Sequence, residues 1–144
     1  MNAKNIASIG VRLNSAVSYL IGRLGWNLQG AKVLDVRGRK SGEIHSVPVN
    51  PLEFGEQRYL VSVRGESAWV RNLRAAGEAT LRRGHDTEVI RIHEIGDNEK
   101  VPILRAYLQK WAWQVKSIMG VGKDASNEEL RAIAAKHPVF EIEP

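Results

Sequence analysis

Hydrophobic side chains recur along this chain with helical spacing in two places. Near the start they fall at steps of three and four, which predicts an amphipathic helix over residues 3–24. After residue 100 the same steps return and predict a second, longer helix. The apolar positions of this longer helix are Val101, Leu104, Leu108, Trp111, Val115 and Ile118. Gly120 and Gly122 follow it and are expected to end it.

Two shorter helices are predicted from the residues at their ends. Ser67 can cap a helix over residues 67–76, and Gly77 can end it. Ser-Asn-Glu-Glu at the start of residues 126–136 is the pattern of a capping box, in which the first and fourth residues bond each other's backbone. Pro138 ends this helix, because proline lacks the amide hydrogen that a helix interior needs.

Between the helices the helical period is lost, and short runs bounded by turn residues predict strands. The expected strands are residues 32–36, 43–54, 58–63 and 139–142, with a hairpin of residues 79–83 and 88–95 around Gly84-His85-Asp86. Pro48 and Pro51 place the second strand at a sheet edge or interrupt it, since proline cannot donate to a ladder. Strands without regularly alternating helices favour an antiparallel barrel over a parallel sheet. The predicted fold is therefore α+β and mainly β.

The composition excludes several classes of protein. The 144 residues are 43% hydrophobic and 26% charged, which is typical of a soluble globular protein of one domain. The absence of cysteine excludes disulfide scaffolds, thiol catalysis and cysteine-bound metals. No apolar run reaches membrane-spanning length and no signal peptide is evident, so a cytoplasmic location is expected. The basic helix over residues 3–24 leaves a peripheral contact with an anionic membrane as an alternative to packing on the barrel.

The net charge of +5 raises the question of an anionic partner. Nucleic acid is not expected, because the chain lacks helix-turn-helix, zinc-finger and aromatic-rich RNA-binding motifs. Instead, basic residues crowd two turns. Arg39 and Lys40 lie in a turn that Gly42 makes permissive, and Arg64 lies in a second turn before a predicted helix. Two such turns suggest a cradle for an acidic small molecule.

No self-contained catalytic group is recognisable in the sequence. No serine lies in a nucleophile elbow, and no P-loop or Rossmann glycine pattern is present. The four histidines, His45, His85, His93 and His137, lack metal-ligand spacing, so no metal site is expected. The catalytic residue therefore stays unknown. The pattern suits an enzyme whose cofactor carries the chemistry while the protein binds and orients it.

Three segments carry a resemblance to a known family. They are Gly38-Arg39-Lys40-Ser41-Gly42 followed by Ser46-Val47-Pro48, then Ser62-Val63-Arg64-Gly65, and then Trp69-Val70-Arg71-Asn72-Leu73. In this order and spacing they resemble the deazaflavin-dependent nitroreductase family, oxidoreductases that use coenzyme F420. The resemblance implies a split β-barrel of the FMN-binding type with flanking helices, in which helix 3–24 precedes a barrel over 30–144. It also implies hydride transfer from reduced deazaflavin to an electron-poor acceptor, such as a quinone, a nitro compound or an activated enone.

The resemblance also implies which residues contact the cofactor. The matching residues are Arg39, Lys40, Ser41, His45, Ser46, Val47, Pro48, Val49, Ser62, Val63, Arg64, Gly65, Trp69 and Asn72. Arg39 and Lys40 would bind the acidic tail, a phosphodiester followed by glutamates, through charge-assisted hydrogen bonds. The backbone of residues 46–49 would lie against the deazaflavin ring. The chain departs from the family at His45, where a basic residue is frequent, and at Asn50, near which the best-known branch often has tyrosine.

Two aromatic residues on the long helix are predicted to contact the acceptor. Tyr107 lies on the flank of the apolar stripe and Trp113 lies nearly opposite it. An aromatic side chain off the stripe needs another surface, either a substrate pocket or a subunit interface. The resembled family has aromatics on the substrate side of this helix, which favours substrate contacts here and leaves an oligomer open. Two other functions stay open: a barrel that carries an apolar ligand such as a fatty acid, and a related FMN-dependent enzyme.

Overall fold

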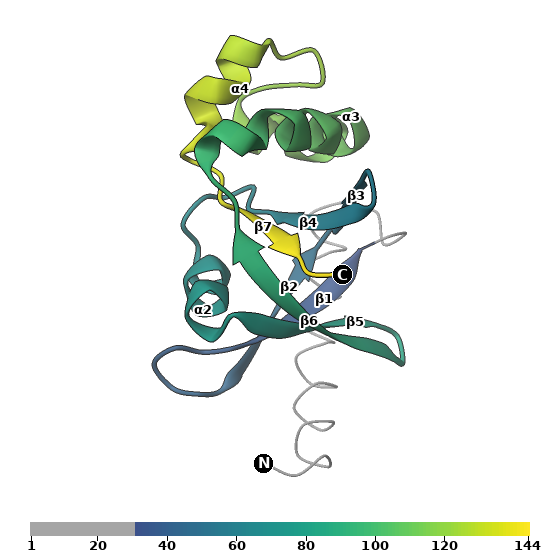
Figure 1. The fold of residues 1–144 in the computed structure, drawn as a ribbon, viewed down its shortest axis with the longest axis vertical. Coiled ribbons are helices and arrows are strands. Elements are labelled where there is room, and N and C mark those ends of the chain that lie inside the picture. The colour runs from purple at the N-terminus through teal and green to yellow at the C-terminus, as the bar shows by residue number, and fades with distance from the viewer. Residues whose placement is uncertain (1–30) are drawn as a thin grey trace.

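The computed structural model describes residues 31–144, whose strands form a curled antiparallel sheet with helices packed against it (Figure 1). The strands are β1 Lys32–Arg37, β2 Ile44–Val49, β3 Leu52–Phe54, β4 Gln57–Val61, β5 Glu78–Arg83, β6 Asp86–Glu94 and β7 Val139–Ile142. Their order across the sheet is β2-β1-β5-β6-β7-β4-β3. All these pairings are antiparallel, which confirms the predicted class.

The helices begin and end close to the predicted residues. They are α2 Ala68–Ala76, α3 Lys100–Met119 and α4 Asn127–Ala134, with a 3₁₀ turn at Asp97–Glu99 before α3. Gly77 ends α2 with a left-handed φ of 74°, and Gly120 ends α3 with a φ of 79°. Ser126 and Glu129 form the predicted capping box, with bonds of 3.1 and 2.9 Å. The helix predicted over residues 3–24, with its membrane contact, lies outside the described residues.

The link between β2 and β3 explains the curl of the sheet. β2 and β3 lie at opposite ends of the strand order, yet only Asn50 and Pro51 separate them in sequence. So short a link can join the two ends only if the sheet bends until its edges approach each other. Both parts of the proline prediction are confirmed, because the strand is interrupted at Pro51 and each half is an edge strand.

Two hydrophobic clusters form the core, and β4 separates them. Leu60 packs with α2 and the strands β1, β5 and β6, whereas Val61 packs with α3 and α4. This alternation follows from the two-residue period of a strand. In Figure 1, α3 and α4 lie together at one end of the molecule, and α2 lies beside the strands at a distance from them. Among residues 31–144, no helix combines the length and apolarity needed to span a bilayer.

Candidate functional site

A cavity of about 560 Å³ opens between β2, the turn after β4, and helices α2 and α3. Its lining residues are Gly38, Arg39, Lys40, Ser41, His45, Ser46, Val47, Pro48, Val49, Asn50, Val61, Val63, Arg64, Ser67, Ala68, Trp69, Asn72 and Tyr107. The cavity lies where the two core clusters meet, since Val49 belongs to one cluster and Val61 to the other. Its walls are therefore apolar, while Arg39, Lys40 and Arg64 are exposed cations among its lining residues.

The basic turn between β1 and β2 is held against α2 by Asn72. The Oδ1 atom of Asn72 accepts from the Arg39 backbone N–H at 3.1 Å and from the Arg39 guanidinium at 2.7 Å. The turn is closed by two backbone bonds, from Gly38 N to Glu43 O at 2.7 Å and from Gly42 N to Gly38 O at 3.0 Å. A Cβ atom at Gly38 would come within 2.8 Å of the His45 ring, so a larger residue there would have to displace the exposed His45 side chain.

The second basic turn follows β4 and is supported from behind. The Ser62 hydroxyl donates to Gly65 O at 2.6 Å, and the Ser62 N–H donates to Pro138 O at 2.9 Å. Nδ1 of His137 lies 2.9 Å from Ser62 O. Burial lowers the pKa of His137, and the positive charge of Lys100 acts in the same direction. These contacts of Ser62 hold the backbone of the second basic turn in place. Val63, the residue after Ser62, lines the cavity.

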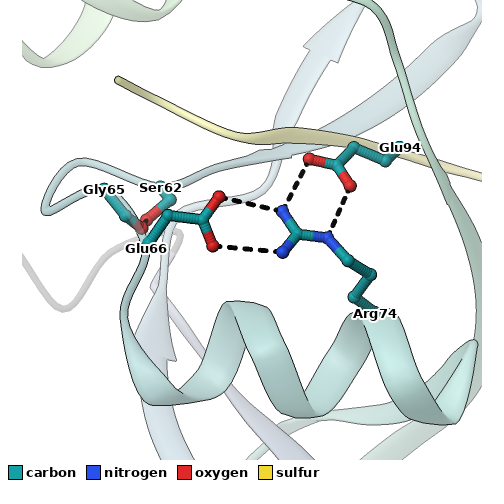
Figure 2. A network of polar contacts seen from close by, with 5 residues as sticks. All are labelled: Ser62, Gly65, Glu66, Arg74 and Glu94. Carbon is teal, nitrogen blue, oxygen red and sulfur yellow. Dashed lines mark hydrogen bonds and ion pairs between the residues drawn. The ribbon is translucent and has the colours of Figure 1, made fainter. Parts of the chain in front are cut away.

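Helix α2 carries Trp69 and Asn72 to the cavity and is itself clamped by Arg74. The Trp69 ring packs against Phe140, with 6.1 Å between the ring centroids. Figure 2 shows the Arg74 guanidinium between two carboxylates. It donates to Glu66 at 3.1 Å and to Glu94 at 2.7 and 2.9 Å. This clamp joins α2 to the turn that bears Arg64 and to the end of β6.

The Ser46 side chain is bonded to the neighbouring strand. Its hydroxyl donates to Asp35 Oδ1 at 2.5 Å, and Arg82 of β5 donates to the same carboxylate. The hydroxyl hydrogen of Ser46 is thus committed to Asp35. Within residues 31–144, β2 lies at one end of the strand order, and the polar backbone groups along its outer edge are not used by this sheet. Pro48 fits such an edge, since it has no N–H to pair.

The cavity is also bordered by two buried polar residues, Tyr107 of α3 and Asn50, which precedes β3. Tyr107 is 2% exposed, and burial raises its pKa to about 12, while the nearby Asn50 side chain acts in the opposite direction. The Asn50 amide also donates to Gln114 Oε1 at 3.3 Å. Sequence reasoning named Tyr107 but noted Asn50 only as a departure, and it gave no role to Gln114. No local motif marks the last two residues, which the fold brings together.

The cavity gathers most of the residues predicted from the resemblance, but not all of them. Arg39, Lys40, Ser41, His45, Ser46, Val47, Pro48, Val49, Val63, Arg64, Trp69, Asn72 and Tyr107 line it. Ser62 and Gly65 lie behind its wall, and Trp113 lies outside it with 66% of its surface exposed. For all of these residues, inside and outside the cavity, the predicted contacts with cofactor and substrate stay predictions. Residues 31–144 contain no cluster of potential metal ligands.

Fold and site together define a class of protein. A curled antiparallel sheet holds a cavity whose lining combines apolar walls with exposed cations. A family model, the F420H(2)-dependent quinone reductase, matches residues 11–124. The chain therefore belongs to the F420H(2)-dependent quinone reductase family. It is an oxidoreductase whose cofactor is coenzyme F420, which confirms the cofactor and the reductase activity predicted from the sequence.

The family model names quinone reductases, so the finer prediction of a nitroreductase stays a prediction. No protein of curated function matches the chain significantly.

Similar solved structures support the fold. An F420-H2 dependent reductase, FDR-A, is 16% identical with a TM-score of 0.53, covering 80% of this chain and 95% of its own. A protein described as a domain-swapped dimer is 16% identical with a TM-score of 0.55, covering 80% and 81%. A Listeria innocua protein, named as a candidate pyridoxamine 5'-phosphate oxidase, is 14% identical with a TM-score of 0.53, covering 90% and 93%. These likenesses indicate a split-barrel-like fold.

Proposed function

We propose that this chain reduces quinone-type acceptors, and that F420 binds in the cavity between β2, α2 and α3. The single observation that carries the proposal is the family match, which covers the segments that form this cavity. The lining fits the cofactor, because the walls are apolar and the cations are exposed. When bound and reduced, F420 supplies the hydride. A nitro compound or an activated enone is a second class of acceptor that the same chemistry would serve.

Each group of lining residues has a distinct part in this proposal. Arg39, Lys40 and Arg64 bind the phosphodiester and glutamates of the tail through charge-assisted hydrogen bonds. Trp69 and the valines of β2 and β4 exclude water from the ring. The open edge of residues 46–49 offers backbone groups to the polar rim of the ring. Tyr107 borders the end of the cavity left for the acceptor.

A titration of purified protein with F420 tests the proposal. Saturable binding at micromolar concentrations, with little affinity for nicotinamide cofactors, is expected. Replacing both Arg39 and Lys40 by alanine should weaken F420 binding strongly and leave the fold intact, because both side chains are exposed. Binding of FMN in place of F420, or a copurifying fatty acid with no cofactor binding, would favour the two alternative functions and overturn this one.

A further inference from the structure

His45 lies near the start of β2, where the strand leaves the basic turn. Its register partner on β1 is Val36, a core residue with 1% exposure. Opposite residues of an antiparallel pair share a face, so the His45 side chain lies on the core side of the sheet, as that of Val47 does two residues on. His45 lines the cavity and is also exposed to solvent.

The imidazole of His45 lies against the basic turn at Gly38. A Cβ atom at Gly38 would lie 2.8 Å from Nε2 of His45, 2.9 Å from Cδ2 and 3.1 Å from the Ser41 hydroxyl. The imidazole edge that carries Nε2 is therefore beside the Gly38 backbone and near Ser41. Arg39 and Lys40 belong to the same turn, so an anion bound there would lie close to the imidazole.

The charges around His45 are mostly positive. The charged residues from the end of β1 to the start of β2, in the second basic turn and on α2 are Arg37, Arg39, Lys40, Glu43, Arg64, Glu66, Arg71 and Arg74. Of the two acids, Glu66 is bound by Arg74, and Glu43 is exposed in the turn. An anion bound among these cations favours the charged form of a neighbouring imidazole. Histidine is the side chain whose charge ordinarily changes between pH 5 and 8.

We propose that binding of the anionic tail of F420 is coupled to the uptake of a proton by His45, whose imidazolium then becomes a further cation for the tail. This inference rests on the proposed function. The proton comes from the solvent, to which His45 is exposed, and no other bond is made or broken. A ligand that promotes protonation must bind more tightly as the pH falls, because the coupling is reciprocal. Arginine and lysine cannot supply this dependence near neutral pH, since they stay charged there.

A calorimetric titration with F420 measures the proton directly. The heats of binding at about pH 7, in two buffers with different heats of ionisation, give the number of protons taken up for each ligand bound. The wild-type protein should take up about half a proton more than His45→Gln, because glutamine is polar but does not titrate. Any proton that F420 itself gains or loses is common to both proteins and cancels in the difference.

The dissociation constant of F420 gives a second readout. Between about pH 8 and pH 6, the affinity of the wild-type protein should rise about fivefold relative to that of His45→Gln. His45→Lys is charged at both values, so at about pH 8 it should bind F420 about fivefold more tightly than the wild type. A purely structural role of the imidazole would not be rescued by lysine. His85→Gln is the matched control, because His85 is exposed outside the lining, and it should keep the wild-type dependence.

The outcomes separate the two proposals. Failure of the wild-type protein to bind F420 overturns the proposed function, and this inference with it. Saturable F420 binding with equal proton uptake in wild type and His45→Gln overturns the inference alone. His137 contacts Ser62 of the second basic turn, so a pH dependence that persists in His45→Gln and disappears in His137→Gln also overturns it. If His45→Gln does not fold, His45→Lys replaces it: lost proton uptake supports the inference, and retained uptake overturns it.

Discussion

At the scale of single residues, Asn72 determines how the basic turn is presented. Its Oδ1 atom accepts two hydrogen bonds from Arg39, and its side chain is 5% exposed. Asn72→Ala should therefore leave the Arg39 backbone and guanidinium without these partners. We expect the F420 affinity to fall about tenfold and the free energy of unfolding to fall by about 1–3 kcal/mol. Fluorescence titration and urea unfolding measure the two effects.

Asn127 provides a matched control for this prediction. Its side-chain oxygen also accepts from an arginine, Arg105, but the pair lies on α3 and α4 outside the lining of the cavity. Asn127→Ala should leave the F420 affinity unchanged. Equal affinities in the two variants would show that the bond from Asn72 to Arg39 does not position the cofactor tail.

Single residues also show where sequence reasoning ends. Arg39 and Asn72 are 33 residues apart in the sequence. They could be assigned to one site because both lie in segments that resemble the deazaflavin-dependent family. Asn50 and Gln114 are 64 residues apart, and no motif contains either as part of a pair. Their bond exists because the β2–β3 link and α3 meet in the fold. The sequence likewise shows His137 only as a histidine without the spacing of metal ligands. Its partner, the Ser62 carbonyl, is a backbone atom 75 residues away, which no side-chain motif can reveal.

At the scale of elements, the Arg74 clamp holds α2 and the second basic turn together (Figure 2). Its two carboxylate partners, Glu94 and Glu66, raise the pKa of Arg74 through hydrogen bonds. Arg74→Met should cost little stability, because exposed ion pairs are screened by water. It should still lower the F420 affinity several-fold, since Arg64 and Trp69 lie on the two parts that the clamp joins. A titration together with a thermal melt measures both.

A second exposed ion pair serves as the control for the clamp. Arg58 makes a two-fold contact with Glu88 between β4 and β6, with one bond of 2.9 Å. Arg58→Met removes a similar surface pair outside the cavity lining and should not change cofactor binding. A loss of affinity in this variant as large as in Arg74→Met would mean that general loosening, rather than the clamp, is responsible.

The elements were largely predictable because their ends depend on local chemistry. Glycines in a left-handed conformation end α2 and α3, and a capping box begins α4. Three ends moved by two residues: β4 stops at Val61 and α4 at Ala134, before the predicted residues 63 and 136, and β6 begins at Asp86, before the predicted residue 88. The order of strands was not predictable, because pairing depends on contacts far apart in sequence. The interruption at Pro51 was visible, but not that it joins opposite edges of the sheet.

At the scale of the whole molecule, His137 makes stability depend on pH. Burial lowers its pKa in the folded state, so the unfolded chain, with a pKa near 6.5, binds the proton more readily. The stability is therefore fully present above about pH 6.5 and is lost as pH falls through the folded pKa. The loss should amount to about 1.4 kcal/mol for each unit of difference between the two pKa values. Urea unfolding between about pH 7.5 and 5.5 measures it.

Two variants separate His137 from the other titrating groups. In His137→Gln, the amide can still donate to Ser62 O and does not titrate, so the pH dependence over this range should become flatter. His93→Gln replaces an exposed histidine and should keep the wild-type dependence. A dependence that persists in His137→Gln would assign it to another group and contradict the prediction.

The charge of the whole molecule sets the last expectation, the response of F420 binding to salt. The net charge is +5, and exposed Arg39, Lys40 and Arg64 concentrate part of it at the cavity. Because salt screens exposed charges, F420 affinity should fall about tenfold between ~0.05 and ~0.5 M salt. Arg39→Ala with Lys40→Ala should flatten this dependence. Arg91→Ala with Arg131→Ala removes the same charge from exposed positions outside the lining and should preserve it; equal slopes in both double variants would assign the attraction to net charge alone.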